Sequence, residues 1–389
     1  MKILLIRTNG NIVNQNSYNL QEIGLAKALC KKGIQCDIVY FYGNNTSKIQ
    51  ELEFDKLKIK IYWIKGISIL HNGIFYKLDN ILSQYDIIQA AEIDQWTSLY
   101  LAFFSRFRDK VTIYHGPYRS QFNRKYLLKF NLTKMLPVNK KQKAIVPIFA
   151  KSNLAKKLLE EYGIKNIIVT GVGLDVDKFT NAKKNDNIEK LINNVKNLNV
   201  LLYIGRIEKR RSITFLIKLL AEIKKENDSV KLILIGDGPK EYIRKCFYLI
   251  HELKLEDNIV YIKKIEQSQL PYIYERADVF LLPTQYEIFG MVLMEAMYFK
   301  VPVITTFNGG SDTLIKNKEN GLILDLNIKV WKKEILDIIN NKEFHKTIGE
   351  KAKETIINEF LWDKISEKMI PVYYQIMKRN NKSEDKECK

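Results

Sequence analysis

The sequence predicts an α/β protein made of two Rossmann-like domains. Three observations predict it: a length of 389 residues, short apolar runs that alternate with segments of helical spacing, and a polar Lys/Asn-rich interruption at residues 180–187. Repeated strand–helix units give parallel sheets that are covered by helices on both faces. Each half of the chain is long enough to bury a core of its own.

The first half predicts one domain over residues 1–180. Its strand candidates are apolar, β-branched runs: Lys2–Ile6, Cys36–Phe41, Lys58–Trp63, Asp86–Gln89, Val111–Tyr114, Ala144–Val146 and Asn166–Thr170. Segments of helical spacing lie between these runs: Asn19–Lys32, Gln95–Phe107 and Asn153–Tyr162.

The second half predicts a linker over residues 181–197 and a second domain over residues 198–360. The strand candidates of this domain are Val200–Ile204, Lys231–Ile235, Asn258–Ile262, Val279–Leu282, Val303–Thr305 and Leu322–Leu324. A final helix is expected within residues 361–379. Residues 380–389 are polar or charged apart from Cys388, which predicts a disordered tail.

Composition and cysteine usage favour a cytoplasmic protein. Hydrophobic residues make up 46% of the chain, as in globular proteins, and no apolar run approaches the ~18 residues that a membrane span needs. Met1 and Lys2 run directly into a strand, which predicts that there is no signal peptide. The four cysteines lack metal-ligand spacing and are expected to be reduced thiols.

Positive charge is concentrated in one segment of a chain with net charge +19. Residues 110–157 contain twelve Lys or Arg and no Asp or Glu, with aromatic and aliphatic side chains between them. Such a stretch can lie on an anionic membrane or bind an anionic acceptor, and the residues singled out for this surface are Arg124, Lys125, Lys129 and Lys134. The alternative is a solvated helix on a Lys-rich protein. Nucleic acid is not expected as a partner because no recognition motif accompanies the charge.

Two carboxylates, Glu287 and Glu295, stand eight positions apart after the buried strand 279–282. The first is expected on the loop at the carboxyl end of the strand, and the second inside the following helix. Ligands of open α/β sheets bind at such strand ends, and the first N–H groups of the helix, from Met291 and Val292, can hold a phosphate. The alternative is two solvated glutamates that flank a helix.

The Glu-x7-Glu spacing around Phe289-Gly290 resembles the retaining nucleotide-sugar glycosyltransferases of family 4, within glycosyl transferases group 1. Further matches follow in the family's order: Gly173-Leu-Asp175 with Phe179, Gly205-Arg206-Ile207, Gly236-Asp-Gly238-Pro239, Pro302–Thr306, Gly309-Gly310, Asn320-Gly-Leu322 and Trp362. The resemblance implies the GT-B fold, in which two Rossmann-like domains face each other across a cleft and the last helix crosses back to the first domain. The first domain would bind the acceptor and the second the nucleotide sugar.

The resemblance also implies an activity. A hexose would pass, with retention by front-side attack, from a nucleotide diphosphate sugar to a hydroxyl of a glycan or lipid-linked glycan, in surface polysaccharide or glycoconjugate assembly. The enzyme would work at the inner face of the membrane, with no cofactor beyond the donor. Glu287 would contact sugar hydroxyls and Glu295 the ribose. Because no Asp-x-Asp follows a strand in a suitable place, Arg206 and Arg211 are expected to neutralise the diphosphate in place of a metal.

Other donor contacts are implied for residues outside the Glu-x7-Glu segment. His115 follows the strand 111–114 and would contact the donor sugar, while Gly10, in the loop after the first strand, would offer backbone N–H groups. The nucleotide base would meet the backbone around Lys264 and Ile265.

The sequence departs from the family pattern in several places, and alternatives stay open. Thr313 stands where a Glu is usual, Ser212 and Lys300 replace glycines, and the loop at Gly10 lacks paired glycines. One alternative is a non-catalytic sugar-binding relative that partners an active enzyme; another is an enzyme with a soluble or protein-borne acceptor. A nicotinamide dehydrogenase would need Gly-x-Gly-x-x-Gly after the first strand, which is absent.

Overall fold

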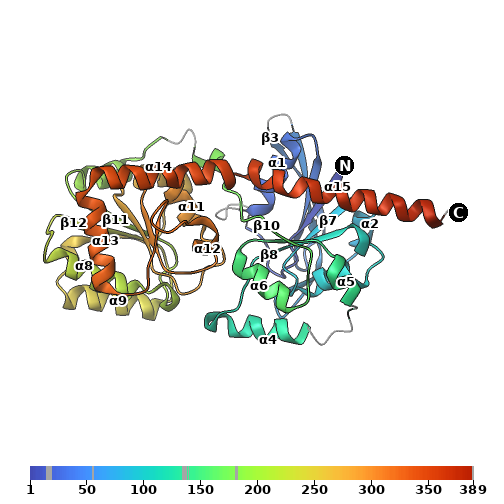
Figure 1. Ribbon diagram of the computed structural model, residues 1–389, viewed down its shortest axis with the longest axis horizontal. Coiled ribbons are helices and arrows are strands. Elements are labelled where there is room, and N and C mark those ends of the chain that lie inside the picture. Colours follow the sequence, from blue (N-terminus) through green and yellow to red (C-terminus); the bar gives the residue numbers. More distant parts are fainter. Residues whose placement is uncertain (15–19, 55–56, 134–137, 139, 180–182, 388–389) are drawn as a thin grey trace. The chain divides into compact units, whose positions relative to one another are not determined.

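The computed structural model describes residues 1–14, 20–54, 57–133, 138, 140–179 and 183–387 (Figure 1). The chain divides into two compact units. Unit 1 comprises Met1–Asp175 and Phe360–Lys389, and unit 2 comprises Val176–Glu359. Each unit contains one twisted, mainly parallel sheet with helices on its faces, so both units are Rossmann-like.

The sheet of unit 1 has the strand order β10-β9-β8-β7-β1-β2-β4-β3. Its strands are β1 (Lys2–Ile6), β2 (Gln35–Phe41), β3 (Lys48–Phe54), β4 (Leu57–Ile64), β7 (Ile87–Ala91), β8 (Val111–His115), β9 (Ile148–Ala150) and β10 (Ile167–Val169). All neighbours are parallel except β3 and β4. The strand order reverses between β1 and β7, and ligands of such sheets bind at the carboxyl ends of the strands that flank this point.

The helices of unit 1 are α1 (Gln21–Lys31), α2 (Asp79–Leu82), α3 (Trp96–Leu99), α4 (Arg124–Thr133), α5 (Lys140–Ile145), α6 (Asn153–Glu161) and α15 (Trp362–Glu387). A π-helical turn, Tyr100–Phe104, continues α3. A separate two-stranded hairpin consists of β5 (Gly66–Ile69) and β6 (Asn72–Phe75). Helices α1 and α15 lie side by side on one face of the sheet (Figure 1).

The last helix packs on unit 1 through two aromatic side chains. Trp362, with which α15 begins, is buried so closely against α1 and the 173 loop that a Cβ on Gly24 or Gly173 would lie 2.1 or 2.2 Å from its ring. Tyr373 donates a hydrogen bond of 2.6 Å to Gln89 of β7. Helix α15 continues to Glu387, so the prediction of disorder from Asn380 onward is wrong as far as that residue. The Lys and Glu residues of this segment are good helix formers and extend a helix that packing has already nucleated.

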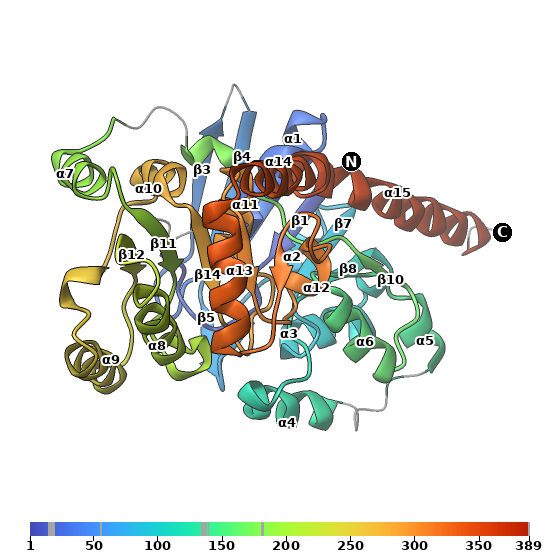
Figure 2. The ribbon, with the colours of Figure 1, turned by 60° about the vertical axis from the view of Figure 1, so that its left-hand side comes forward.

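The sheet of unit 2 is entirely parallel, in the order β13-β12-β11-β14-β15-β16. Its strands are β11 (Asn199–Ile204), β12 (Val230–Ile235), β13 (Ile259–Ile262), β14 (Val279–Leu282), β15 (Val303–Thr305) and β16 (Leu322–Ile323). Its helices are α7 (Asp186–Asn194), α8 (Ile213–Lys224), α9 (Lys240–Glu252), α10 (Leu270–Arg276), α11 (Met291–Tyr298), α12 (Ser311–Leu314), α13 (Ile328–Asn340) and α14 (Lys342–Glu359). Helix α13 packs against α8 (Figure 2).

Two predictions about the chain's organisation are corrected. Much of the expected linker, residues 181–197, is the helix α7, because Asn185 caps its start with a 3.0 Å bond from the Ile188 N–H and Ile188 is buried in unit 2. The strand expected at Ala144–Val146 is wrong in position, because helix α5 continues to Ile145. The strand begins after Pro147, as β9 (Ile148–Ala150).

Within the described ranges, no helix is both long enough and apolar enough to cross a membrane.

Candidate functional site

The candidate site of unit 2 lies where the strand order of its sheet reverses. The chain moves outward from β11 to β13 and then returns to β14 on the other side of β11. Two loops, residues 205–212 and 283–290, therefore leave the carboxyl ends of neighbouring strands. This is the crevice in which open α/β sheets bind ligands.

Glycines let the loops of this edge approach each other by their backbones. A Cβ on Gly236 would lie 1.8 Å from the Gly205 carbonyl oxygen, and Gly236 also has a φ of +148°. A Cβ on Gly238 would lie 1.8 Å from the Ile207 carbonyl oxygen. The motif glycines after β11 and β12 thus hold the 205–212 loop in place.

An ion pair between Arg211 and Glu287 joins the two loops. Both side chains are largely buried, with exposed fractions of 11% and 16%, and Arg211 Nη1 also donates to Thr284 Oγ1 at 3.3 Å. Burial acts to lower the pKa of Arg211, but the attraction of Glu287 outweighs it and raises that pKa. The two sequence-predicted residues therefore form one charge-balanced pair.

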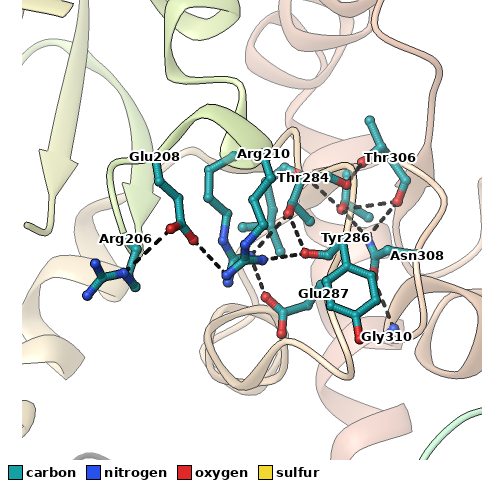
Figure 3. Close-up of polar contacts among 12 residues, drawn as sticks. Arg206, Glu208, Arg210, Thr284, Tyr286, Glu287, Thr306, Asn308 and Gly310 are labelled. Atoms are coloured by element: carbon teal, nitrogen blue, oxygen red, sulfur yellow. Dashed lines mark hydrogen bonds and ion pairs between the residues drawn. The ribbon is translucent and has the colours of Figure 1, made fainter. Parts of the chain in front are cut away.

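Arg210 makes a second connection between the same loops, which sequence reasoning missed. Its Nη1 donates to the Tyr286 carbonyl at 2.5 Å, and its Nη2 lies 2.7 Å from Glu208 (Figure 3). Glu208 also faces Arg206 at 3.7 Å, although the Arg206 side chain is 64% exposed. Arg206 thus remains accessible to a ligand, whereas Arg210 and Arg211 hold the loop that carries Glu287.

The loop after β15 supports the Glu287 loop from the other side. Asn308 accepts bonds from the N–H groups of Gly310 and Ser311 at 3.0 and 3.1 Å and donates to the Thr306 carbonyl at 2.7 Å. The Gly309 N–H donates to the Glu287 carbonyl at 3.1 Å, and a Cβ on Gly310 would lie 1.8 Å from the Phe289 carbonyl oxygen. The paired glycines therefore belong to the site, and Asn308 is a supporting residue that the sequence reading did not single out.

Helix α11 begins at Met291, immediately after Gly290, whose φ of +82° turns the chain into the helix. The N–H groups of Met291 and Val292 have no partner within the helix, as in any first helical turn. Glu295 is 0% exposed and accepts a 2.9 Å bond from the Tyr274 hydroxyl. As the structure stands, a ribose reaches this carboxylate only if Tyr274 or α11 moves.

The other donor residues expected in unit 2 lie after β13. Lys264 is exposed and Ile265 half-buried in the loop of residues 263–266. Thr313, which replaces a family Glu, donates from its hydroxyl to the Gly309 carbonyl at 3.1 Å. The Thr313 side chain is therefore tied to the loop of the paired glycines.

In unit 1, His115 belongs to a buried charged cluster at the ends of β7, β8 and β9. Its Nδ1 lies 3.0 Å from Glu92, and its Nε2 lies 3.3 Å from the Tyr126 hydroxyl. Glu92 also accepts from Lys151 Nζ at 2.8 Å and from the Gly116 N–H at 2.9 Å. Burial acts to raise the pKa of Glu92, but Lys151 and His115 outweigh it and lower that pKa to about 2. Sequence reasoning missed Glu92 and Lys151, although both directly follow strands.

The rings of Tyr126 and Phe130, from helix α4, cover His115. Their centroids lie 6.5 and 6.4 Å from that of the imidazole, and His115 is 0% exposed. A donor sugar therefore cannot touch His115 unless α4 moves. Because Phe130 is buried and Tyr126 partly buried against His115, these two rings do not belong to a fully exposed amphipathic surface, whereas Phe122 and Leu128 remain exposed.

Two further expectations in unit 1 are affected by the structure. The sequence analysis expected the Gly10 N–H to bind the donor. In the structure this N–H donates to the His71 carbonyl at 2.8 Å and is therefore not available to a donor. Of the cations chosen for a membrane or acceptor surface, Arg124 is exposed at the start of α4. Lys134 lies outside the described residues, as do the side chains of Lys125 and Lys129.

Ligand atoms of Glu92, Asp94 and His115 lie within 4.8 Å of one another, close enough to share a metal ion. Lys151 already places an ammonium group on Glu92, so a cation at this point would have to displace an existing one.

The family model for glycosyl transferases group 1 matches residues 184–355, which carry every site residue described above for unit 2. Unit 2 is a group 1 glycosyltransferase domain. Curated relatives of this family include N-acetyl-alpha-D-glucosaminyl L-malate synthase of Bacillus anthracis, 28% identical over 46% of each chain. The capsular polysaccharide biosynthesis glycosyltransferase CapM of Staphylococcus aureus is 32% identical over 59% of each chain. The chain thus spans about half the length of the curated relatives it matches.

Solved structures of glycosyltransferases match nearly the whole chain in fold. Sucrose-phosphate synthase from Thermosynechococcus elongatus has a TM-score of 0.72 at 19% identity, and the match covers 97% of this chain and 99% of that one. Anabaena Alr3699/HepE, solved with UDP, has a TM-score of 0.70 at 18% identity, with coverage of 96% and 100%. The GT-B fold expected from the sequence, with two Rossmann-like domains, is confirmed.

Proposed function

We propose that this protein is a retaining glycosyltransferase of family 4, which moves a hexose from a nucleotide diphosphate sugar to a hydroxyl of a glycan or lipid-linked glycan. The observation that carries the proposal is the ion pair of Arg211 with Glu287 at the switch point of the sheet in unit 2, with the exposed Arg206 on the same loop as Arg211. Cations and a carboxylate at this point suit a substrate that joins an anionic diphosphate to a sugar. Structural neighbours of the chain were solved with UDP and with UDP-glucose, which supports a nucleotide-sugar donor.

The reaction breaks the bond between the anomeric carbon and the diphosphate and forms a bond from that carbon to the acceptor oxygen. Arg206, Arg211 and the N–H groups of Met291 and Val292 would stabilise the negative charge that grows on the leaving diphosphate. Glu287 would accept bonds from sugar hydroxyls while the anomeric carbon becomes cationic. The departing phosphate oxygen would take the proton of the acceptor hydroxyl, which gives retention by front-side attack.

The donor sugar and Arg211 would compete for the carboxylate of Glu287. In the structure Arg211 is neutralised by Glu287, so a bound diphosphate would offer the guanidinium a second anion and leave the carboxylate free to meet the sugar. Lys264 and Ile265 would line the position of the base, and Glu295 would act mainly by holding Tyr274 beneath α11. The acceptor would bind to unit 1, in surface polysaccharide or glycoconjugate assembly at the inner face of the membrane.

A panel of nucleotides and sugar nucleotides tests the proposal. A donor that binds only the folded protein raises the unfolding midpoint by mass action, and an enzyme slowly releases free nucleotide from that donor even without an acceptor. A midpoint shift without nucleotide release would favour the alternative of a non-catalytic sugar-binding relative. If transfer occurs only to soluble or protein-borne hydroxyls, the acceptor is of that class and not a lipid-linked glycan.

Metal independence is a separate expectation. If arginines neutralise the diphosphate, donor hydrolysis and transfer should persist in excess EDTA. Arg206→Ala should cost on the order of 2–4 kcal/mol of transition-state stabilisation, as does loss of one oxyanion donor. Lys209→Ala removes an exposed positive charge from the same loop and serves as the matched control, with little change expected. Activity that disappears in EDTA and returns with Mn²⁺ or Mg²⁺ would show that a metal does this work.

A further inference from the structure

We propose that unit 1 contacts an anionic lipid surface through an exposed apolar surface that the sequence analysis did not identify. We call it the hairpin surface, and it consists of Ile67, Ile69, Ile74, Trp96, Tyr100 and Phe104. The inference rests on the proposed function, because it gives the place at which the enzyme would meet the membrane that holds a lipid-linked acceptor.

The hairpin β5–β6 has one apolar and one backbone-packed face. Ile67 lies opposite Ile74 in the antiparallel register, and Ile69 is two residues from Ile67, so strand alternation puts the three on one face. The exposed fractions of the side chains are 44% for Ile67, 42% for Ile69 and 37% for Ile74. On the opposite face, a Cβ on Gly73 would lie 3.1 Å from the carbonyl oxygens of Thr8 and Asn9. The hairpin is therefore fixed on the loop after β1, with its isoleucines turned outward.

The helical segment 96–104 adds aromatic side chains to this surface. Trp96, Tyr100 and Phe104 recur every four residues and are between 41% and 51% exposed. The segment is anchored to β6, because the Trp96 N–H donates to Asn72 Oδ1 at 3.0 Å and Thr97 Oγ1 donates to the Gly73 carbonyl at 2.6 Å. A cavity of about 340 Å³ lies between the two elements and is lined mainly by apolar side chains, among them Ile74, Trp96 and Tyr100.

The side chains and charges of this surface fit a lipid bilayer with anionic headgroups. Exposed apolar patches mark interaction sites, and Trp and Tyr beside aliphatic side chains suit the boundary between headgroups and acyl chains. Lys65 and Lys77 are both exposed at the open end of the hairpin, where the Tyr76 N–H donates to the Lys65 carbonyl at 2.9 Å, and residues 65–78 contain no Asp or Glu. Arg106 and Arg108 follow Phe104, and Arg106 pairs with Asp79 at 3.8 Å. The surface thus combines exposed apolar side chains with cations at the open end of the hairpin and after Phe104.

The location differs from the one that the charge pattern predicts. In the basic segment, Phe130 is buried and Tyr126 is partly buried over His115, so that Phe122 and Leu128 are the exposed large apolar residues of the described part of helix α4 and the turn before it. The hairpin surface has fewer cations but more exposed apolar side chains, and insertion into a bilayer requires both.

Tryptophan fluorescence gives a local test. Trp63, Trp331 and Trp362 are buried, whereas Trp96 is 41% exposed, so a change of polarity at the surface is reported by Trp96. The full-length protein is mixed with vesicles of phosphatidylcholine alone or with added phosphatidylglycerol. We expect sedimentation with the anionic vesicles, a shift of emission to shorter wavelength, and quenching by brominated acyl chains. In Trp96→Phe, the spectral shift and quenching should disappear.

Two variants separate the apolar and charge contributions. Combined Ile67→Ser, Ile69→Ser and Ile74→Ser should abolish sedimentation, while the control pair Val330→Ser and Ile357→Ser, at similarly exposed positions, should not. Lys65→Gln with Lys77→Gln should weaken partitioning roughly 30-fold at low salt, since each near-surface cation contributes about fivefold. The control pair Lys329→Gln and Lys333→Gln, also exposed, should change it little.

Absence of binding to anionic vesicles would overturn the inference, and so would sedimentation that leaves Trp96 fluorescence unchanged or the isoleucine variant unaffected. A Trp96 shift caused by soluble oligosaccharides but not by vesicles would make the cavity a sugar site instead. Donor hydrolysis depends on the residues of unit 2 and should survive in both hairpin variants. Absence of vesicle binding by the wild-type protein, with its donor hydrolysis intact, would therefore reject this surface alone, whereas absence of hydrolysis in the wild-type protein would reject the proposed function.

Discussion

Replacing Glu287 by glutamine is expected to lower turnover by about a hundredfold or more, while the variant still binds nucleotide at least as tightly as the wild-type chain. The change keeps the size of the side chain but removes the charge that faces sugar hydroxyls as the anomeric carbon becomes cationic. Loss of one preorganised electrostatic contact of this kind typically costs about 10²–10³ in rate. Single-turnover kinetics measures the effect on the chemical step, and a separate nucleotide-binding measurement gives the effect on affinity.

The position of Arg211 makes this prediction sharper. Its guanidinium is largely buried against Glu287, and glutamine offers only an amide oxygen in place of a counter-charge. We therefore expect the variant also to unfold at a lower temperature, which a bound diphosphate should partly restore by giving Arg211 an anion. Glu208→Gln is the control, because it removes a carboxylate that pairs with Arg206 and Arg210 in the same loop. Similar, small effects of both substitutions on rate would contradict a catalytic role for Glu287.

Much of the parallel core could be predicted because the relevant signals are local. Buried strands such as β11 and β14 are mostly apolar runs of four to six residues, and a glycine or a proline, Gly205 or Pro283, follows directly where each ends. Since functional loops of this fold begin at strand ends, Arg206 and Glu287 could be assigned to one edge of the sheet from sequence order alone. In the structure, Arg211 and Glu287 form an ion pair at this edge.

The exposed strands were missed because their patterns are weak. Strand β3 alternates charged with apolar residues at the edge of the sheet, and the hairpin β5–β6 is short, with glycines at Gly66 and Gly73 and isoleucines that face outward. A strand is recognised from sequence by apolar residues that face the core and alternate with exposed polar ones, and the outward-facing isoleucines of this hairpin do not follow that rule. The same contradiction is what marks the hairpin surface as an interaction site once the structure is known.

Burial of the site residues depends on contacts between distant segments. The residues next to His115 in the sequence do not indicate that Tyr126 and Phe130 cover it. Those next to Glu295 do not indicate that the Tyr274 hydroxyl donates to its carboxylate. Glu92 was missed for a related reason: a single acid after a strand has no distinctive pattern, and its partners lie 23 and 59 positions further along the chain. Such clusters follow from strand order, which the sequence does not state.

Replacing Glu92 by glutamine should destabilise unit 1 by about 3 kcal/mol at neutral pH. Glu92 contacts both Lys151 and His115, and its removal leaves the buried Lys151 ammonium without its counter-charge. A carboxyl group whose pKa falls from 4.5 to about 2 on folding contributes a stabilisation of this size. Urea unfolding at a series of pH values measures it directly.

The pH dependence has a definite sign. Because the pKa of Glu92 is lower in the folded chain, its stabilisation is fully present above about pH 4.5 and is lost as the pH falls towards 2. The difference in unfolding free energy between the wild-type protein and Glu92→Gln should therefore be constant from pH 7 to 5 and shrink below that. Glu51→Gln, which removes an exposed carboxylate that pairs with Lys58, should change nothing measurable across the range. A difference that stays the same at pH 3 would show that the charge of Glu92 does not stabilise the cluster, and that glutamine disturbs its packing instead.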